Sequence, residues 1–162
     1  MTTIRTADLI ESVADALQFI SYFHPMDYIH ALGEAYEAEQ GPAAKDAIAQ
    51  ILTNSRMCAE GHRPICQDTG IVNVFVAWGM DCRLDDTSAS LQDVIDEGVR
   101  RAYLNPENKL RASVLTDPAF TRRNTKDNTP CVLHVEMVPG NTVSVDVAAK
   151  GGGSEKDRKS VV

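Results

Sequence analysis

The sequence has 162 residues, a length typical of one domain. Apolar residues make up 43% and charged residues 24%, close to the globular average, so the composition excludes a disordered or fibrous chain. The net charge of -7 has the wrong sign for a broad nucleic-acid-binding face. No apolar run is long enough for a membrane span or a signal peptide. We therefore expect a cytoplasmic protein with neither a nucleic-acid nor a membrane partner.

The first part of the chain predicts helices. Apolar residues recur at three- and four-residue steps over 6–23, which is typical of an amphipathic helix. Two more helices are predicted over about 25–39 and 42–61, because a proline suits the first turn of each and a glycine follows each end. This gives a helical segment over 1–61.

From residue 62 onwards the pattern changes. Residues 71–78 are rich in β-branched and aromatic types and predict a buried strand. A helix capped by Thr87 or Ser88 is expected to run to about Tyr103. Two segments, 131–138 and 142–149, alternate in period two around a Pro-Gly-Asn turn, which predicts a β-hairpin.

These elements predict an α+β fold. The helical segment 1–61 is followed by a small mixed or antiparallel sheet with a helix over 62–155, and a short tail covers 156–162. The irregular stretch 105–130 is longer than most connections in compact domains, so we expect it to be functional or packed on another polypeptide. The chain is expected to be the front part of a larger fold.

Two polar motifs contain side chains suited to ligand chemistry. In PICQDTG (64–70), Cys66 offers a soft thiolate metal ligand beside the hydrogen-bonding groups of Gln67 and Asp68; an ordinary thiol in a turn is the alternative. In NKLR (108–111), Arg111 could bind a carboxylate through two hydrogen bonds, and the alternative is a solvated loop. Arg122, Arg123, Lys109 and Lys126 complete a local basic cluster in this acidic chain.

Two further motifs are rich in turn-forming residues. The glycines of KGGGS (150–154) could form a nest of backbone N–H groups for an anion, or simply a flexible linker. In NTKDNTP (124–130), the Asn and Asp side chains favour Asx-turns and a structural role. Cys58, Cys82 and Cys131 form no C-x-x-C pair and are interpreted as structural thiols.

In the chain order PICQDTG, NKLRASV, NTKDNTP and KGGGSE, the four motifs resemble the N-terminal region of the class I, iron-sulfur fumarate hydratases and the related tartrate dehydratases, over about 6–155. The resemblance implies a hydro-lyase that interconverts fumarate and L-malate. It also implies a 4Fe-4S cluster held by three cysteines, whose open iron acts as a Lewis acid.

The resemblance further implies roles for individual residues. Cys66 matches the first cluster ligand, and Asp68 matches a catalytic carboxylate that also contacts the substrate. The substrate-binding amide corresponds to Gln67, the carboxylate-binding arginine to Arg111, and the backbone contact of the triple-glycine loop to Gly153.

The family's other two cluster cysteines lie downstream of the glycine motif, beyond the end of this sequence. The isolated chain is therefore expected to lack a cluster and to be inactive on fumarate or malate. It is expected to form a homo-oligomer or to associate with a missing C-terminal part. The alternatives are a subunit of a dehydratase for tartrate or another 2-hydroxydicarboxylate, a non-catalytic interaction or dimerisation module, and a small anion-binding protein.

Overall fold

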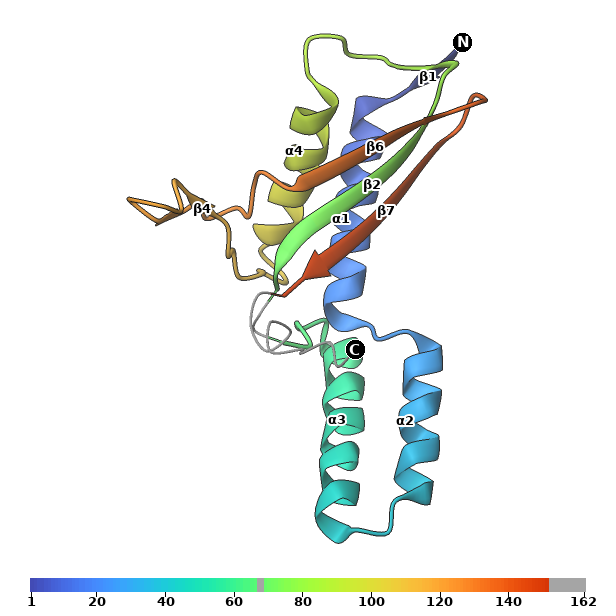
Figure 1. Cartoon of the computed structure of the whole chain (residues 1–162), viewed down its shortest axis with the longest axis vertical. Helices are drawn as coiled ribbons and strands as arrows, with labels where there is room; N and C mark the ends of the chain where they lie inside the picture. Colours follow the sequence, from blue (N-terminus) through green and yellow to red (C-terminus); the bar gives the residue numbers. More distant parts are fainter. Residues whose placement is uncertain (67–68, 152–162) are drawn as a thin grey trace, which may run out of the picture. The chain divides into compact units, whose positions relative to one another are not determined.

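The computed structural model describes residues 1–66 and 69–151, and their combination of helices with small sheets confirms the α+β prediction (Figure 1). The chain divides into two compact units. Met1–Gln18 and Gln67–Val162 form the sheet unit, and Phe19–Cys66 forms the helical unit. This division differs from the predicted boundary at residue 61, because most of the first helix belongs with the sheet.

The three predicted N-terminal helices are confirmed. Helix α1 spans Thr6–Tyr22, α2 spans Met26–Ala38 and α3 spans Pro42–Gly61. Pro42 lies in the first turn of α3, and the helix ends where His62 adopts a left-handed conformation with φ 47°. In the part of the chain that the structure describes, no helix is both long and apolar enough to cross a membrane.

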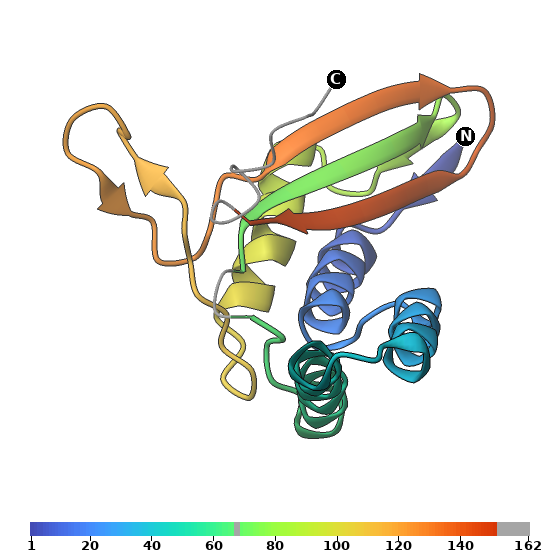
Figure 2. The ribbon, with the colours of Figure 1, turned by 60° about the horizontal axis from the view of Figure 1, so that its bottom comes forward.

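A three-stranded mixed sheet forms the centre of the sheet unit. Its middle strand is β2 (Ile71–Gly79), with β6 (Val132–Val138) parallel on one side and β7 (Val143–Lys150) antiparallel on the other (Figure 2). The predicted hairpin of the last two strands is therefore wrong, because β2 lies between them. Alternate side chains of β2 are buried from Val72 to Trp78, so one face of this strand points into the core.

Helices α1 and α4 (Leu91–Tyr103) cover one face of this sheet (Figure 2). The helix α4 is capped by Ser90, whose hydroxyl accepts a hydrogen bond from Asp93 N in a capping box. The predicted caps Thr87 and Ser88 are wrong, since Asp86 holds the Ser88 N–H and hydroxyl in a turn before the helix. The core combines apolar residues of these helices and of β2, namely Leu9, Val13, Leu17, Val72, Val74, Val76, Val94, Ile95, Val99 and Ala102.

Four short strands were not predicted. Strands β1 (Thr2–Ile4) and β3 (Cys82–Leu84) pair in parallel, and β4 (Leu115–Thr116) and β5 (Arg123–Asn124) pair antiparallel within the irregular stretch. Two or three residues are too few to show a periodicity, so these pairs depend on contacts made by the folded chain.

Gly98 sets how closely α1 and α4 approach, and its replacement tests this packing. A Cβ at Gly98 would lie 2.8 Å from Val13 Cβ and 2.9 Å from the Ile10 carbonyl oxygen. We expect Gly98→Ala to lower the free energy of unfolding by about 1–3 kcal/mol, measured by urea denaturation. The matched control is Gly33→Ala in α2, where a Cβ meets nothing within 4 Å. Because alanine favours a helix more than glycine does, this substitution should stabilise the protein by about 1 kcal/mol. Equal effects of the two substitutions would contradict this account.

Candidate functional site

Parts of the four polar motifs converge at Gly70, directly before β2. Thr69 Oγ1 donates a hydrogen bond to the carbonyl oxygen of Arg111. The side chain of Asn128 donates to the Gly70 carbonyl oxygen over 3.0 Å. Lys150, at the end of β7, pairs with Ile71 in the sheet. Segments as far apart in the sequence as Ile71 and Lys150 therefore meet at one end of the sheet (Figure 1).

Glycine is required at position 70 for two reasons. Its φ of 71° lies in the left-handed region, which side chains disfavour. A Cβ would also lie 2.5 Å from the carbonyl carbon of Lys150 and 2.8 Å from the nitrogen of Gly151, where no side chain fits. Gly70 therefore lets the backbone of the 64–70 motif lie directly against the backbone of the 150–154 motif at Lys150 and Gly151.

Asn128 links the remaining motifs through one fully buried side-chain amide. Its Oδ1 accepts hydrogen bonds from Ser113 N at 2.6 Å and from Val114 N at 3.1 Å, while its Nδ2 donates to Gly70 O. Its φ of 63° is left-handed, a conformation that asparagine tolerates better than most residues. One amide thus fixes the segment after Arg111 and the turn before β2.

Side chains of α1 and α4 also position the loops around the Gly70 turn. Tyr103, at the end of α4, donates its hydroxyl hydrogen to the Thr69 carbonyl oxygen over 2.7 Å. Gln18 of α1 and Asn108 form a buried amide pair, with Asn108 Nδ2 donating to Gln18 Oε1 over 2.8 Å. Gln18 Nε2 also donates to the carbonyl oxygens of Ala102 and Asn108. The segment that leads to Arg111 is therefore anchored on both helices.

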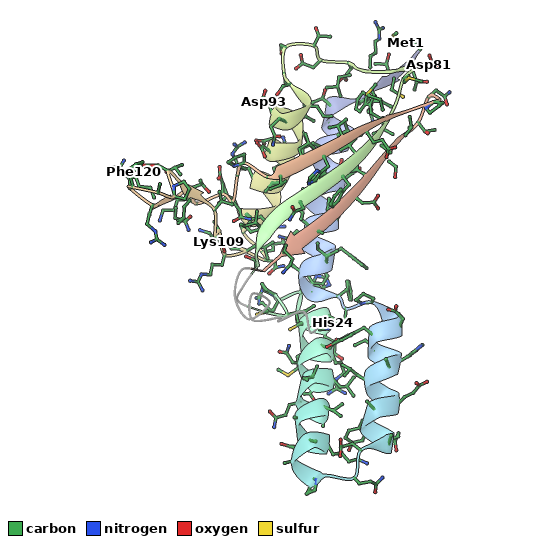
Figure 3. The ribbon with its side chains drawn as sticks, in the orientation of Figure 1. Met1, His24, Asp81, Asp93, Lys109 and Phe120 are labelled. Carbon is green, nitrogen blue, oxygen red and sulfur yellow. The ribbon has the colours of Figure 1, made fainter. Side chains whose placement is uncertain are left out.

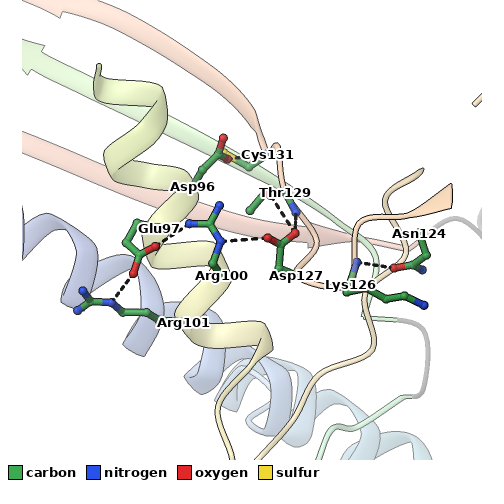
Figure 4. A network of polar contacts seen from close by, with 9 residues as sticks. All are labelled: Asp96, Glu97, Arg100, Arg101, Asn124, Lys126, Asp127, Thr129 and Cys131. Atoms are coloured by element: carbon green, nitrogen blue, oxygen red, sulfur yellow. Dashed lines mark hydrogen bonds and ion pairs between the residues drawn. The ribbon is translucent and has the colours of Figure 1, made fainter. Parts of the chain in front are cut away.

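A network of ion pairs and hydrogen bonds attaches the 124–130 motif to α4 (Figure 4). Arg100 donates to Asp127 over 3.0 Å and to Glu97 over 2.6 Å. Burial alone would raise the pKa of Asp127, but hydrogen bonds from Thr129 and the Arg100 guanidinium outweigh it, so this pKa lies below its usual value. The predicted Asx-turns are confirmed, since Asn124 and Asp127 accept hydrogen bonds from the N–H groups two residues later.

The four cysteines differ in their surroundings. Cys66 is exposed in a bend after α3, within the helical unit. Cys58, Cys82 and Cys131 are buried, in agreement with their interpretation as structural thiols. Burial, together with the nearby Asp96 carboxylate, raises the pKa of Cys131 to about 12, so this thiol remains protonated at neutral pH.

The described residues do not form a cluster site by themselves. They contain no group of three or more His, Cys, Asp or Glu side chains placed to hold a metal ion. A 4Fe-4S cluster is normally held by several cysteine thiolates, and among the described residues only Cys66 is an exposed cysteine.

The remaining predicted site residues fall into two groups. Gln67, Asp68 and Gly153 lie outside the described residues. Arg111 is exposed, and its backbone carbonyl oxygen accepts the hydrogen bond from Thr69 Oγ1 beside the Gly70 turn.

The predicted basic cluster is spread along the irregular stretch. Figure 3 shows Lys109 near the base of this stretch and Phe120 at its far end. Arg123 belongs to β5 in the projecting arm formed by β4 and β5, and Arg122 immediately precedes it. Of these basic residues, Arg111 lies where the motifs meet, because its backbone carbonyl oxygen accepts the hydrogen bond from Thr69.

Sequence reasoning missed the two residues that hold the site together. Tyr103 was predicted only as the end of a helix, and Asn128 only as part of a loop with local turns. The unusual density of Asn, Asp and Thr before Pro130 was the available signal, but it does not show which side chain reaches a distant segment.

A comparison with family models decides the classification. The model of the family described as fumarate hydratase (Fumerase) matches residues 10–162. The chain belongs to the fumarate hydratase (Fumerase) family. The resemblance inferred from the four motifs is thereby confirmed.

Curated relatives of this Fumerase-family chain are alpha subunits. The putative L(+)-tartrate dehydratase subunit alpha of Methanocaldococcus jannaschii is 29% identical over 148 residues, which cover 88% of this chain and 50% of that relative. The L(+)-tartrate dehydratase subunit alpha of Escherichia coli K12 is 28% identical over 155 residues, covering 95% of this chain and 50% of the relative. The chain therefore spans about half the length of the curated relatives it matches.

Removing the Asn128 amide should loosen the site of this Fumerase-family chain. Asn128→Ala leaves the N–H groups of Ser113 and Val114 without their buried acceptor, and should lower the free energy of unfolding by about 2–4 kcal/mol. Hydrogen exchange should accelerate at Ser113 and Val114. The control is Asn141→Ala, an exposed position where we expect a change of less than about 0.5 kcal/mol. Unchanged exchange at both amides would contradict the linking role.

The thiols should differ in reactivity. Iodoacetamide at neutral pH is expected to alkylate Cys66 in the folded chain and to leave Cys131 unmodified, because Cys131 is buried and its pKa is about 12. Peptide mass spectrometry measures the modification at each site. Urea should abolish the difference. Labelling of Cys131 at the rate of Cys66 in the native protein would contradict the structure.

Proposed function

We propose that this chain supplies the N-terminal portion of an iron-sulfur hydro-lyase that interconverts fumarate and L-malate. The observation that carries the proposal is the convergence of the four family motifs at Gly70, together with the family match. A ligand site assembled from distant segments, with an exposed arginine beside it, suits a small dicarboxylate in an otherwise acidic chain.

The proposed roles follow the resemblance. Arg111 binds a substrate carboxylate, Gln67 and Asp68 contact the substrate, and Asp68 takes part in the chemistry. The backbone at Gly153 contributes a further contact. Hydration adds a hydroxyl group to one carbon of the fumarate double bond and a proton to its neighbour, and dehydration reverses both steps. Holding the carboxylates in place orients the two carbons for this transfer.

Cys66 is proposed as one ligand of a 4Fe-4S cluster in the complete enzyme. Its exposure within the described residues is compatible with this role, whereas the three buried thiols are not. The cluster, when bound, supplies a Lewis acid for the substrate hydroxyl. Because one thiolate cannot hold such a cluster, the other ligands must come from additional polypeptide, and the chain alone is expected to be inactive.

A tartrate dehydratase is the second candidate, and the names of the relatives favour it. The Methanocaldococcus jannaschii and Escherichia coli proteins are both described as L(+)-tartrate dehydratase alpha subunits. Malate and tartrate are both 2-hydroxydicarboxylates that lose water, so the same arginine and cluster ligand serve either substrate. The two functions are distinguished by which substrate is turned over faster.

Reconstitution tests the proposed function. The chain is loaded anaerobically with iron and sulfide, alone and co-expressed with the second half of the Escherichia coli K12 alpha subunit. We expect cluster absorbance, and turnover of fumarate, malate or L(+)-tartrate, only in the mixture. Cys66→Ser should abolish both, while Cys82→Ala should retain both. Activity of the chain alone would contradict the need for further ligands, and a cluster that persists in Cys66→Ser would contradict the ligand assignment.

Substitution of Arg111 tests substrate binding in the reconstituted enzyme. Arg111→Lys removes the paired hydrogen bonds to a carboxylate, so kcat/KM should fall by about 10²-fold while cluster absorbance is unchanged. Arg123→Lys in β5 is the matched control and should change kcat/KM by less than about twofold. Equal effects of the two substitutions would exclude Arg111 from the binding site.

A further inference from the structure

The arm formed by β4 and β5, residues 115–124, contributes no residue to the core. Every residue from 116 to 123 is exposed, and the two ends of the arm are half-buried. Figures 1 and 2 show the arm standing away from the sheet and from α4. A two-stranded hairpin that packs on nothing is only marginally stable in water, so the arm gains stability when another surface covers it.

The tip of the arm presents apolar side chains to the solvent. Pro118, Ala119 and Phe120 are consecutive, and all three are exposed. Phe120 is 84% exposed, and among the large apolar residues that the structure describes only Met1 is more exposed. Figure 3 shows Phe120 at the far end of the arm. Aromatic residues are enriched in protein interfaces, and covering this ring removes a large apolar area from water.

The turn that carries Phe120 is ordered by its own hydrogen bonds. The carbonyl oxygen of Asp117 accepts hydrogen bonds from the N–H groups of Phe120, over 3.2 Å, and of Arg122, over 3.1 Å. The carboxylate of Asp117 accepts a further hydrogen bond from the Thr121 N–H over 3.0 Å. The ring therefore projects from a preorganised turn, and less conformational entropy is lost when a partner binds it.

The base of the arm is attached to the candidate site. The Thr125 N–H donates to the Val114 carbonyl oxygen over 3.0 Å. The Val114 N–H in turn donates to Asn128, the side chain that also holds the Gly70 turn. Val114 lies three residues after Arg111 in the chain. A polypeptide that completes the site beside Arg111 therefore comes close to the arm.

We infer that this β4–β5 arm docks on the polypeptide that corresponds to the second half of the relatives' alpha subunits, with Phe120 in an apolar pocket of that polypeptide. The inference rests on the proposed function, in which the same polypeptide supplies the remaining cluster ligands. The matched segment covers 50% of each relative, so a polypeptide of similar length is available to cover the arm. Because the arm begins beside the Gly70 turn, the polypeptide that brings ligands to this turn is the one placed to receive Phe120.

Copurification tests the docking on the full 162-residue chain, co-expressed with the second half of the Escherichia coli K12 alpha subunit. We expect the two polypeptides to copurify, and Phe120→Ala to reduce the recovered partner by about tenfold or more. The matched control is Met80→Ala, which removes another exposed apolar side chain after the opposite end of β2 and should leave recovery unchanged. The urea midpoint of the Phe120→Ala chain alone should not move, because Phe120 is exposed. No copurification, or equal recovery with Phe120→Ala, would overturn the inference.

Photocrosslinking in the same co-expressed pair identifies what covers the tip. With p-benzoylphenylalanine in place of Phe120, we expect a crosslink to the second half of the relative's subunit, and mass spectrometry locates the linked residues. The same group in place of Met80 is the control and should give no such crosslink. A crosslink from position 120 only to another copy of the chain, or no crosslink, would overturn the inference.

Turnover separates the failure of this inference from the failure of the proposed function. Copurification that requires Phe120, without turnover of fumarate, malate or L(+)-tartrate after cluster loading, would contradict the proposed function and support the docking. Turnover with a partner whose recovery does not depend on Phe120 would overturn the docking and leave the proposed function intact.

Discussion

The arrangement of the candidate site depends on one buried side-chain amide, that of Asn128. It accepts hydrogen bonds from two backbone N–H groups and donates one to the Gly70 carbonyl group, and in doing so joins the turn before β2 to the segment after Arg111. A side chain with both an acceptor and a donor is needed here, and a left-handed backbone brings it into place. The site is therefore held by polar contacts rather than by the apolar core.

The apolar core acts on the site indirectly. Close packing of α1 on α4 at Gly98 fixes the two helices under the sheet, and the ends of these helices carry Gln18 and Tyr103. These two side chains then reach the loop at Asn108 and the turn at Thr69. Burial of apolar surface thus positions the helices, and hydrogen bonds from the helix ends then position the loops.

Local charge compensates for an acidic chain. The net charge of -7 repels a dicarboxylate at long range, so an anionic substrate requires a nearby cation or backbone N–H groups. Arg111 is proposed to meet this need, while Arg100 is engaged by Glu97 and Asp127. The distinction between the two arginines comes from their partners, which sequence alone does not reveal.

The sequence by itself determined the four long helices, the central strand, the family and the candidate residues Cys66 and Arg111. These depend on short-range periodicity, on turn residues and on ordered motifs, all of which are local. Only the tertiary structure decided that β2 separates the last two strands, that Ser90 caps α4, and that Asn128 and Tyr103 hold the turn at Gly70. Strand order and buried hydrogen bonds depend on which distant segments compete for the same partners, and that competition is settled only when the whole core packs.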